Sequence, residues 1–225
     1  MCCTMTHSTP PSFRSPIDVF GDWALQGKDK GMETGHARAV ANMLDFAIPR
    51  VQSPESFSFL DAGCGNGWVV RNVREMAGCR TAMGVDGAKE MIEKAQSLDP
   101  EHTDSYQCAD LMTWTPEQPL DLVHSMEVFY YVEDPASLIK HAFEQWIAPG
   151  GRLILGVDFY RENTVSHDWP EQCGVDTMTL LSQGEWINAF VQAGFQECEH
   201  WRVDQHTKPD WEGTLVLTGV VPSPK

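Results

Sequence analysis

Basic residues are scarce in this 225-residue sequence, which contains 16 Lys and Arg against 32 Asp and Glu and has a formal net charge of −16. Such a charge repels nucleic-acid phosphates and anionic membrane surfaces. The sequence also lacks an apolar run of about 18 residues, the length that a membrane span needs. We therefore expect neither a nucleic-acid nor a membrane partner. The acidic surface serves either solubility or the attraction of a cationic substrate.

Paired cysteines and metal-binding histidine spacings are missing as well. The seven cysteines are scattered without a CxxC pair, and the eight histidines form no HxxxH or HxxEH motif. The N-terminal stretch "MCCTMTHSTPPSFRSP" has no apolar core of the kind that secretory signals carry. These absences predict reduced thiols, a cytoplasmic location and no metal site. Residues 1–16 are expected to form a disordered tail.

The sequence does contain a regular alternation of short apolar runs and helical segments. Residues 17–52 are expected to form a helical extension or lid, and residues 53–222 one domain. The predicted strands are 57–60, 80–86, 105–110, 120–126, 152–158, 197–203 and 213–221. The alternation predicts a doubly wound α/β fold with a mostly parallel, seven-stranded sheet flanked by helices, in which the last strand is antiparallel. A monomer or a homodimer is expected.

Three glycines at every second position follow the first predicted strand, in the segment "FSFLDAGCGNGWVV" (57–70). Ligands of open α/β sheets bind beyond the carboxyl ends of the strands, where this turn lies. The dinucleotide fingerprint would need a glycine where Trp68 stands, and an acidic residue before the turn disfavours a pyrophosphate. A dinucleotide is therefore not expected. The candidate ligand-binding positions are Asp61, Gly63, Gly65, Asn66 and Gly67.

Two further aspartates end the next two predicted strands. Asp86 is placed to accept hydrogen bonds from ribose hydroxyls, and Asp110 from an exocyclic amine such as that of adenine. Together with the glycine turn they describe a ligand that has a ribose, a base and a positive centre and carries no phosphates. S-adenosylmethionine (SAM) fits this description.

Four segments, in this order and at these intervals, resemble the motifs of class I SAM-dependent methyltransferases that act on small molecules. The segments are "LDAGCGNG", "GVDGAKEMIEKA", "CADL" and "LDLVHSMEVFYYVEDP", and an "IAPGG" turn precedes the fifth large strand. The resemblance extends from about residue 36 to residue 221. It implies the Rossmann-like methyltransferase fold, SAM as cofactor and S-adenosylhomocysteine as product. It adds Gly87, Met91, Leu111 and His124 to the expected cofactor contacts.

The expected mechanism is a direct in-line displacement, in which a lone pair of the acceptor attacks the methyl carbon of the sulfonium. The protein then mainly supplies proximity, alignment and a dry site. A general base is needed only if the acceptor arrives protonated. The candidates are His124, Glu127, Asp158 and His167, and His124 has the alternative of only lining the cofactor site.

Residues expected to contact the acceptor come from three segments. Trp23 and His36 belong to the N-terminal extension, and Tyr130 and Tyr131 follow the fourth strand. Tyr160 and Trp169 belong to the long polar and aromatic segment 159–181. They are included because such long loops are commonly functional. For the aromatic residues, packing without a role in binding remains the alternative.

The resulting expectation is methyl transfer from SAM to an N, S or O nucleophile of a small molecule. A protein methyltransferase is the first alternative, but "HSME" stands where amine-methylating enzymes of that kind have NPPY- or DPPY-like motifs. A non-catalytic SAM-binding regulatory protein is the second alternative. The intact acidic and glycine positions of the first two motifs argue against it.

Overall fold

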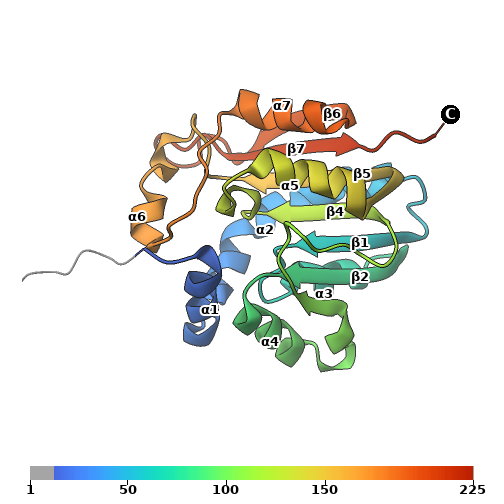
Figure 1. The fold of residues 1–225 in the computed structure, drawn as a ribbon, viewed down its shortest axis with the longest axis horizontal. Helices are drawn as coiled ribbons and strands as arrows, with labels where there is room; N and C mark the ends of the chain where they lie inside the picture. Colours follow the sequence, from blue (N-terminus) through green and yellow to red (C-terminus); the bar gives the residue numbers. More distant parts are fainter. Residues whose placement is uncertain (1–12, 225) are drawn as a thin grey trace, which may run out of the picture.

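Seven strands form one sheet in the order β3-β2-β1-β4-β5-β7-β6 in the computed structural model, which describes residues 13–224. Strands β1 to β5 run parallel, and β7 is antiparallel to both of its neighbours, as its reversed arrow in Figure 1 shows. This confirms the predicted mostly parallel sheet with an antiparallel last strand. The strands are β1 (Phe57–Ala62), β2 (Cys79–Asp86), β3 (Tyr106–Cys108), β4 (Leu120–Met126), β5 (Ile147–Val157), β6 (Gln196–Val203) and β7 (Thr214–Val220).

Helices cover both faces of the sheet. All six residues of β1 are buried, because a central parallel strand is covered on both sides. The α-helices are α1 (Pro16–Gln26), α2 (Asp29–Ala47), α3 (Trp68–Arg74), α4 (Lys89–Leu98), α5 (Pro135–His141), α6 (Trp169–Cys173) and α7 (Gln183–Ala193). Shorter turns are η1 (Ile48–Arg50), η2 (Pro100–Ser105), η3 (Phe129–Tyr131), the π-helical η4 (Ala142–Trp146) and η5 (Thr164–Ser166).

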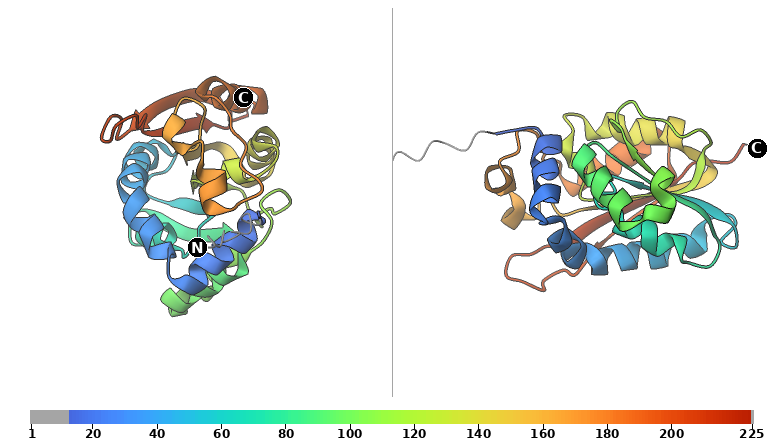
Figure 2. Two further views of the ribbon diagram at one scale, coloured as in Figure 1. Left: turned by 90° about the vertical axis from the view of Figure 1, so that its left-hand side faces the viewer. Right: turned by 90° about the horizontal axis from the view of Figure 1, so that it is seen from below.

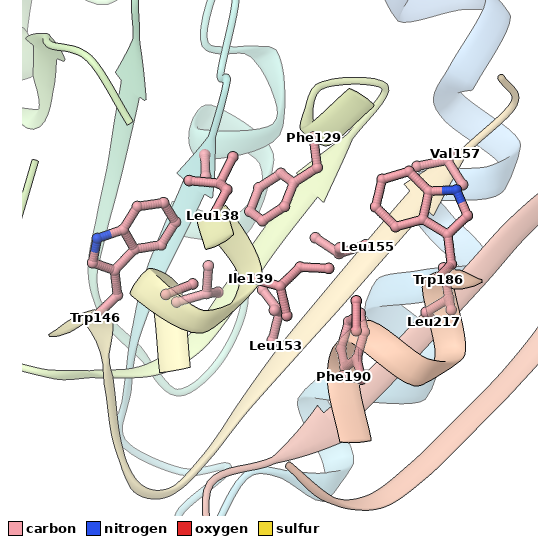
Figure 3. Close-up of a cluster of buried hydrophobic side chains, with 14 of the residues drawn as sticks. Phe129, Leu138, Ile139, Trp146, Leu153, Leu155, Val157, Trp186, Phe190 and Leu217 are labelled. Carbon is pink, nitrogen blue, oxygen red and sulfur yellow. The ribbon is translucent and has the colours of Figure 1, made fainter. Parts of the chain in front are cut away.

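Two hydrophobic clusters sit on the two faces of the sheet. One packs α5, η4 and α7 against β4, β5 and β7, and Figure 3 shows Trp146, Leu155 and Trp186 among its side chains. The other packs α2, α3 and α4 against the opposite face, with Met43 and Val70 fully buried. Helix α2 is therefore part of the core as well as part of the predicted extension.

The N-terminal segment is anchored at the carboxyl end of the sheet. Residues 1–12 of the predicted tail lie outside the described residues, and residues 13–16 lie within them. The backbone of Arg14 pairs with that of Gly174 and Asp176, and the Ser15 hydroxyl caps α1 by accepting from Asp18 N. Figure 1 shows the result, since α1 and α6 lie at the same end of the molecule.

The segment 159–181, expected from its sequence to be a long loop, contains η5 and α6. Helix α7 follows it and begins with the predicted capping box, in which Ser182 and Glu185 exchange hydrogen bonds. Within residues 13–224, no helix combines the length and the apolar character that crossing a bilayer requires.

A buried carboxylate joins three elements behind the glycine turn. Asp99, at the end of α4, accepts hydrogen bonds from Arg74, from the Tyr106 hydroxyl (2.7 Å) and from His102 Nδ1 (2.8 Å). Burial alone would raise the pKa of Asp99, but the hydrogen bonds from Tyr106, Arg74 and His102 hold it well below its usual value. The ionised form of Asp99 therefore stabilises the folded state.

We predict that Asp99→Asn lowers the free energy of unfolding at pH 7 by about 1–3 kcal/mol, measured by urea denaturation. The pKa of Asp99 is depressed on folding, so its contribution is complete above the unfolded value of about 3.9 and is lost as the pH falls below it. The difference in free energy of unfolding between wild type and Asp99→Asn should therefore be smaller at about pH 3 than at pH 7. Asp104→Asn, at an exposed position, is the control and should leave stability unchanged. Equal stability of Asp99→Asn and wild type at pH 7 would refute the stabilising role of ionised Asp99.

Candidate functional site

A cavity of about 470 Å³ opens at the carboxyl ends of β1, β2 and β4. Its size lies within the usual range of small-molecule sites, about 300–1,000 Å³. The end-on view in Figure 2 shows α1 and α6 in front of this end of the sheet. The lining residues are Ser15, Pro16, Ile17, Phe20, Trp23, Met32, His36, Gly63, Gly65, Asp86, Gly87, Ala88, Met91, Asp110, Leu111, Met126, Glu127, Val128, Tyr130, Tyr131, Val132, Trp169 and Cys173.

The glycine turn after β1 forms the floor of the cavity. Gly63, Gly65 and Gly67 have φ values of 78°, 52° and 76°, a left-handed conformation that favours glycine. A Cβ on Gly63 would lie 2.2 Å from Cγ2 of Val128, so this position also excludes a side chain. At Gly65 the nearest atoms would be 3.8 Å or more away. The backbone at Gly65 is thus open to a ligand in the cavity.

The Asp86 carboxylate ties this turn to the end of β2. One oxygen accepts from Gly65 N (2.9 Å) and the other from Ala88 N (2.8 Å). Burial raises the pKa of Asp86, and these two hydrogen bonds oppose the increase. Each carboxylate oxygen has a second lone pair, so Asp86 can still accept hydrogen bonds from hydroxyl groups in the cavity.

Seven of the expected cofactor contacts line the cavity. Met91 and Leu111 contribute apolar surface, whereas Asp110 is exposed and accepts from Met112 N through Oδ1 (2.9 Å). One side of the cavity therefore offers two apolar side chains between two carboxylates. The seven residues are Gly63, Gly65, Asp86, Gly87, Met91, Asp110 and Leu111.

Three other expected contacts support the turn from behind. Asn66 donates to Asp29 Oδ2 (2.8 Å) at the start of α2, and both side chains are buried. Gly67 precedes α3, where a Cβ would lie 2.5 Å from the Tyr106 ring. Asp61 is buried and hydrogen-bonded to His124 Nδ1 (2.7 Å). None of Asp61, Asn66 and Gly67 lines the cavity.

The position of His124 corrects the sequence-based expectation. Its side chain is fully buried, held by Asp61 and stacked on the ring of Phe59, and it does not line the cavity. A buried imidazole without access to the cavity cannot take a proton from an acceptor there. His124 therefore contacts Asp61, which precedes the glycine turn, and does not contact the cavity.

Two other expected residues are also outside the cavity. Tyr160 is fully buried, and its hydroxyl donates to Gly213 O (2.9 Å). His167 is exposed, with Nε2 placed 3.0 Å from Arg161 O. The expectation that these side chains reach an acceptor is not supported, because β5 directs Tyr160 into the core and η5 directs His167 to solvent.

Glu127, Asp158 and His36 come together at the edge of the cavity, which His36 and Glu127 line. One potential ligand atom from each residue lies within 4.8 Å of the other two. Glu127 accepts from Asp158 N and from the Tyr130 hydroxyl (2.6 Å). Burial raises the pKa of Glu127, and the nearby Asp158 raises it further. Burial also raises the pKa of Asp158 to about 6 and lowers that of His36 to about 4.

Aromatic rings from three segments, α1, η3 and α6, form another wall of the cavity. Phe20 on α1 packs edge-on against Trp23 (centroids 5.2 Å apart) and against Tyr131 (4.9 Å). Tyr130 and Trp169 complete this part of the lining. The sequence identified four of these five residues and missed Phe20. The helical pattern of residues 16–26, with Val19 and Ala24 buried, is the signal that would have placed it.

The charged side chains that line the cavity are all acidic. They are Asp86, Asp110 and Glu127, and His36 is the one ionisable base among the described lining residues. No Lys or Arg of residues 13–224 contributes to the lining. The cavity therefore disfavours an anionic ligand and favours a neutral or positively charged one.

Comparison with known proteins identifies methyltransferases as the relatives of this chain. A family model described as a methyltransferase domain matches residues 30–200. The ubiquinone biosynthesis O-methyltransferase of Hydrogenovibrio crunogenus is 32% identical over 141 residues, which are 61% of this chain and 57% of that protein. The trans-aconitate 2-methyltransferase of Agrobacterium fabrum is 32% identical over 136 residues, 60% of this chain and 49% of that protein. The chain thus spans about half the length of these two curated relatives.

A solved complex of the Haloferax volcanii Trm112 methyltransferase activator with a methyltransferase contains a chain similar to this one. The similarity covers 94% of this chain and 100% of that chain, at 30% identity and a TM-score of 0.75. The N-methyltransferase NodS of Bradyrhizobium japonicum, solved with S-adenosylhomocysteine, covers 85% of this chain and 87% of its own, at 18% identity and a TM-score of 0.60. At that identity, NodS shows similarity of fold alone.

We predict that Gly63→Ala lowers the free energy of unfolding by about 2 kcal/mol or more, because it adds both left-handed strain and the Val128 clash. Gly35→Ala is the matched control: this glycine lies inside α2 with open space around it, and the change should raise stability by about 0.5–1 kcal/mol. Chemical denaturation of both variants measures the difference. Equal effects of the two changes would contradict the geometry of the turn.

Proposed function

This chain belongs to the class I SAM-dependent methyltransferases, and we propose that it transfers the methyl group of SAM to a small, uncharged or cationic acceptor through an O, N or S nucleophile. The observation that carries the proposal is the single cavity in which the glycine turn, Asp86 and Asp110 meet the aromatic wall and Glu127. Donor and acceptor would share this space, as a direct transfer requires.

In the proposed complex, SAM lies along the carboxyl ends of β1 to β3. The Asp86 carboxylate accepts from the ribose hydroxyls, and the open backbone at Gly65 allows close approach of the ligand. Met91 and Leu111 pack on the adenine, and the exposed Asp110 accepts from its amine. The glycine turn then directs the sulfonium methyl group toward Glu127 and the aromatic wall.

The chemistry asked of the protein is modest, because the sulfonium is already activated. The acceptor lone pair forms the new bond to the methyl carbon as the carbon–sulfur bond breaks, and S-adenosylhomocysteine leaves. The aromatic wall and α1 exclude water and align the acceptor with the methyl group. A phenol, an alcohol, a thiol or an amine each meets these requirements.

The charge of the cavity narrows the acceptor class. Several relatives are named for trans-aconitate, a tricarboxylate. In this chain, the described lining offers such an anion three carboxylates and no Lys or Arg. We therefore propose an acceptor different from a polycarboxylate. A phenolic or amine acceptor fits the rings of Phe20, Trp23 and Tyr131 better, since aromatic faces also favour cations.

The similarity to a methyltransferase solved with its Trm112 activator extends the proposal to partners. A small activator protein is a candidate partner of this chain, in addition to the small-molecule acceptor. The cytoplasmic location and the monomeric or homodimeric state stay predictions.

We predict that Asp86→Asn weakens SAM binding by about tenfold or more, because hydrogen bonds to an ionised acceptor each contribute about 1.5–3 kcal/mol. Isothermal titration calorimetry with SAM and with S-adenosylhomocysteine measures the change. Glu93→Gln is the matched control, since Glu93 is an exposed carboxylate on α4 that pairs only with Lys89. An unchanged affinity of Asp86→Asn for SAM would contradict the proposal that Asp86 binds the cofactor.

A screen of acceptors at a fixed SAM concentration tests the acceptor class, with the release of S-adenosylhomocysteine as the measured signal. Catechols, phenols, aryl amines, thiols and trans-aconitate form the panel. We expect turnover with a neutral or cationic member and none with trans-aconitate, because the acidic lining repels the anion. Methylation of trans-aconitate as the preferred acceptor would contradict the proposed acceptor class.

A further inference from the structure

His36, Glu127 and Asp158 are far apart in the sequence and adjacent in the fold. His36 lies on α2, Glu127 follows β4, and Asp158 follows β5. Because β4 and β5 are parallel neighbours, their carboxyl ends bring the two carboxylates to the same edge of the sheet. One imidazole nitrogen and two carboxylate oxygens then lie within 4.8 Å of one another. The absence of a metal-binding motif in the sequence does not bear on such a cluster, since three separate elements form it.

Within residues 13–224 the two carboxylates form no ion pair, and the positive charge of Lys208 acts on Asp158 only from a longer distance. No Lys or Arg there forms an ion pair with Glu127 or Asp158, and none lines the cavity. Asp158 is 5% exposed, and its Oδ1 atom is buried without a hydrogen-bond partner. Buried carboxylates in proteins are normally paired or bound to a metal ion. The unpaired Oδ1 of Asp158 therefore lies near the partly buried carboxylate of Glu127, an arrangement that can accept a cation.

Hydrogen bonds hold the Glu127 side chain and the backbone of Glu127 and Asp158 in place. Glu127 N donates to Gly156 O (2.9 Å), and the Tyr130 hydroxyl donates to the Glu127 carboxylate (2.6 Å). Asn163 Nδ2 donates to Asp158 O (2.8 Å). Metal ligands are usually oriented by outer hydrogen bonds of this kind. Each Glu127 oxygen keeps a lone pair beyond the hydrogen bond it accepts, so Glu127 remains able to bind a cation.

We propose that His36, Glu127 and Asp158 bind one divalent transition-metal ion of the Mn²⁺ or Zn²⁺ type. The donor set consists of one imidazole and two carboxylates, which suits these ions better than Mg²⁺ or Ca²⁺, whose sites are built from oxygen ligands. Three protein ligands leave coordination positions open, as in catalytic metal sites.

The open positions would face the cavity. His36 and Glu127 line it, whereas Asp158 lies behind them. An ion there would hold an oxygen or nitrogen atom of the acceptor beside the methyl group of SAM, a role that rests on the proposed function. The charges of the two carboxylates balance that of the ion, so the cavity would still carry no net positive charge.

A titration of the full-length protein with Mn²⁺, without SAM or acceptor, tests the site. Electron paramagnetic resonance measures the free ion and thereby the amount bound. We expect one tightly held Mn²⁺ per chain, with a dissociation constant below about 1 mM, and competition by Zn²⁺. His36→Gln and Asp158→Asn should each weaken Mn²⁺ binding by about tenfold or more. Asp110→Asn, which changes a cavity carboxylate outside the cluster, should bind Mn²⁺ like the wild type.

Thermal unfolding of each variant checks that the fold is retained. His36→Gln should disturb folding less than Asp158→Asn, because His36 is partly exposed on a helix. Failure of the wild-type protein to bind Mn²⁺ below about 1 mM overturns the proposal. Equal binding by wild type and both ligand variants also overturns it, because the ion would then sit elsewhere. SAM titrations on the same samples keep this result separate from the proposed methyltransferase function.

Discussion

The hydrogen bonds that Gly65 N and Ala88 N donate to the Asp86 carboxylate fix the geometry on which the whole site depends. They join the turn after β1 to the end of β2 and the start of α4. The turn can make this connection because its glycines adopt left-handed φ values. With the turn anchored in this way, its backbone at Gly65 faces an open cavity, and the neighbouring helices need only cover that cavity from the sides.

The cover comes from two segments that are far apart in the sequence. Helix α1 closes one side through Phe20, which packs on Tyr131, and α6 adds Trp169 and Cys173. The backbone of Arg14 joins the two segments by pairing with Gly174 and Asp176. The proposed acceptor side of the cavity is thus made of helices outside the sheet, while the proposed cofactor side is made of strand ends that the core holds in place.

Electrostatics links the proposed acceptor class with the proposed metal site. Every charged side chain of the described lining is acidic, burial raises the pKa of both Glu127 and Asp158, and the nearby Asp158 raises that of Glu127 further. A bound divalent ion would oppose these increases and would supply the positive charge that the protein itself does not place there. Without it, a cationic acceptor is the remaining partner for these carboxylates.

The sequence by itself determined the fold class and identified seven expected cofactor contacts that the structure brings to one cavity, because glycines and aspartates at strand ends act through local backbone geometry. It could not place His124, Tyr160 or His167, since whether such a side chain faces a cavity, the core or solvent depends on the direction of its strand or loop. It also missed Phe20 and the Arg14 pairing. Only the tertiary structure brought His36, Glu127 and Asp158 together, because contacts between α2, β4 and β5 have no fixed spacing along the chain.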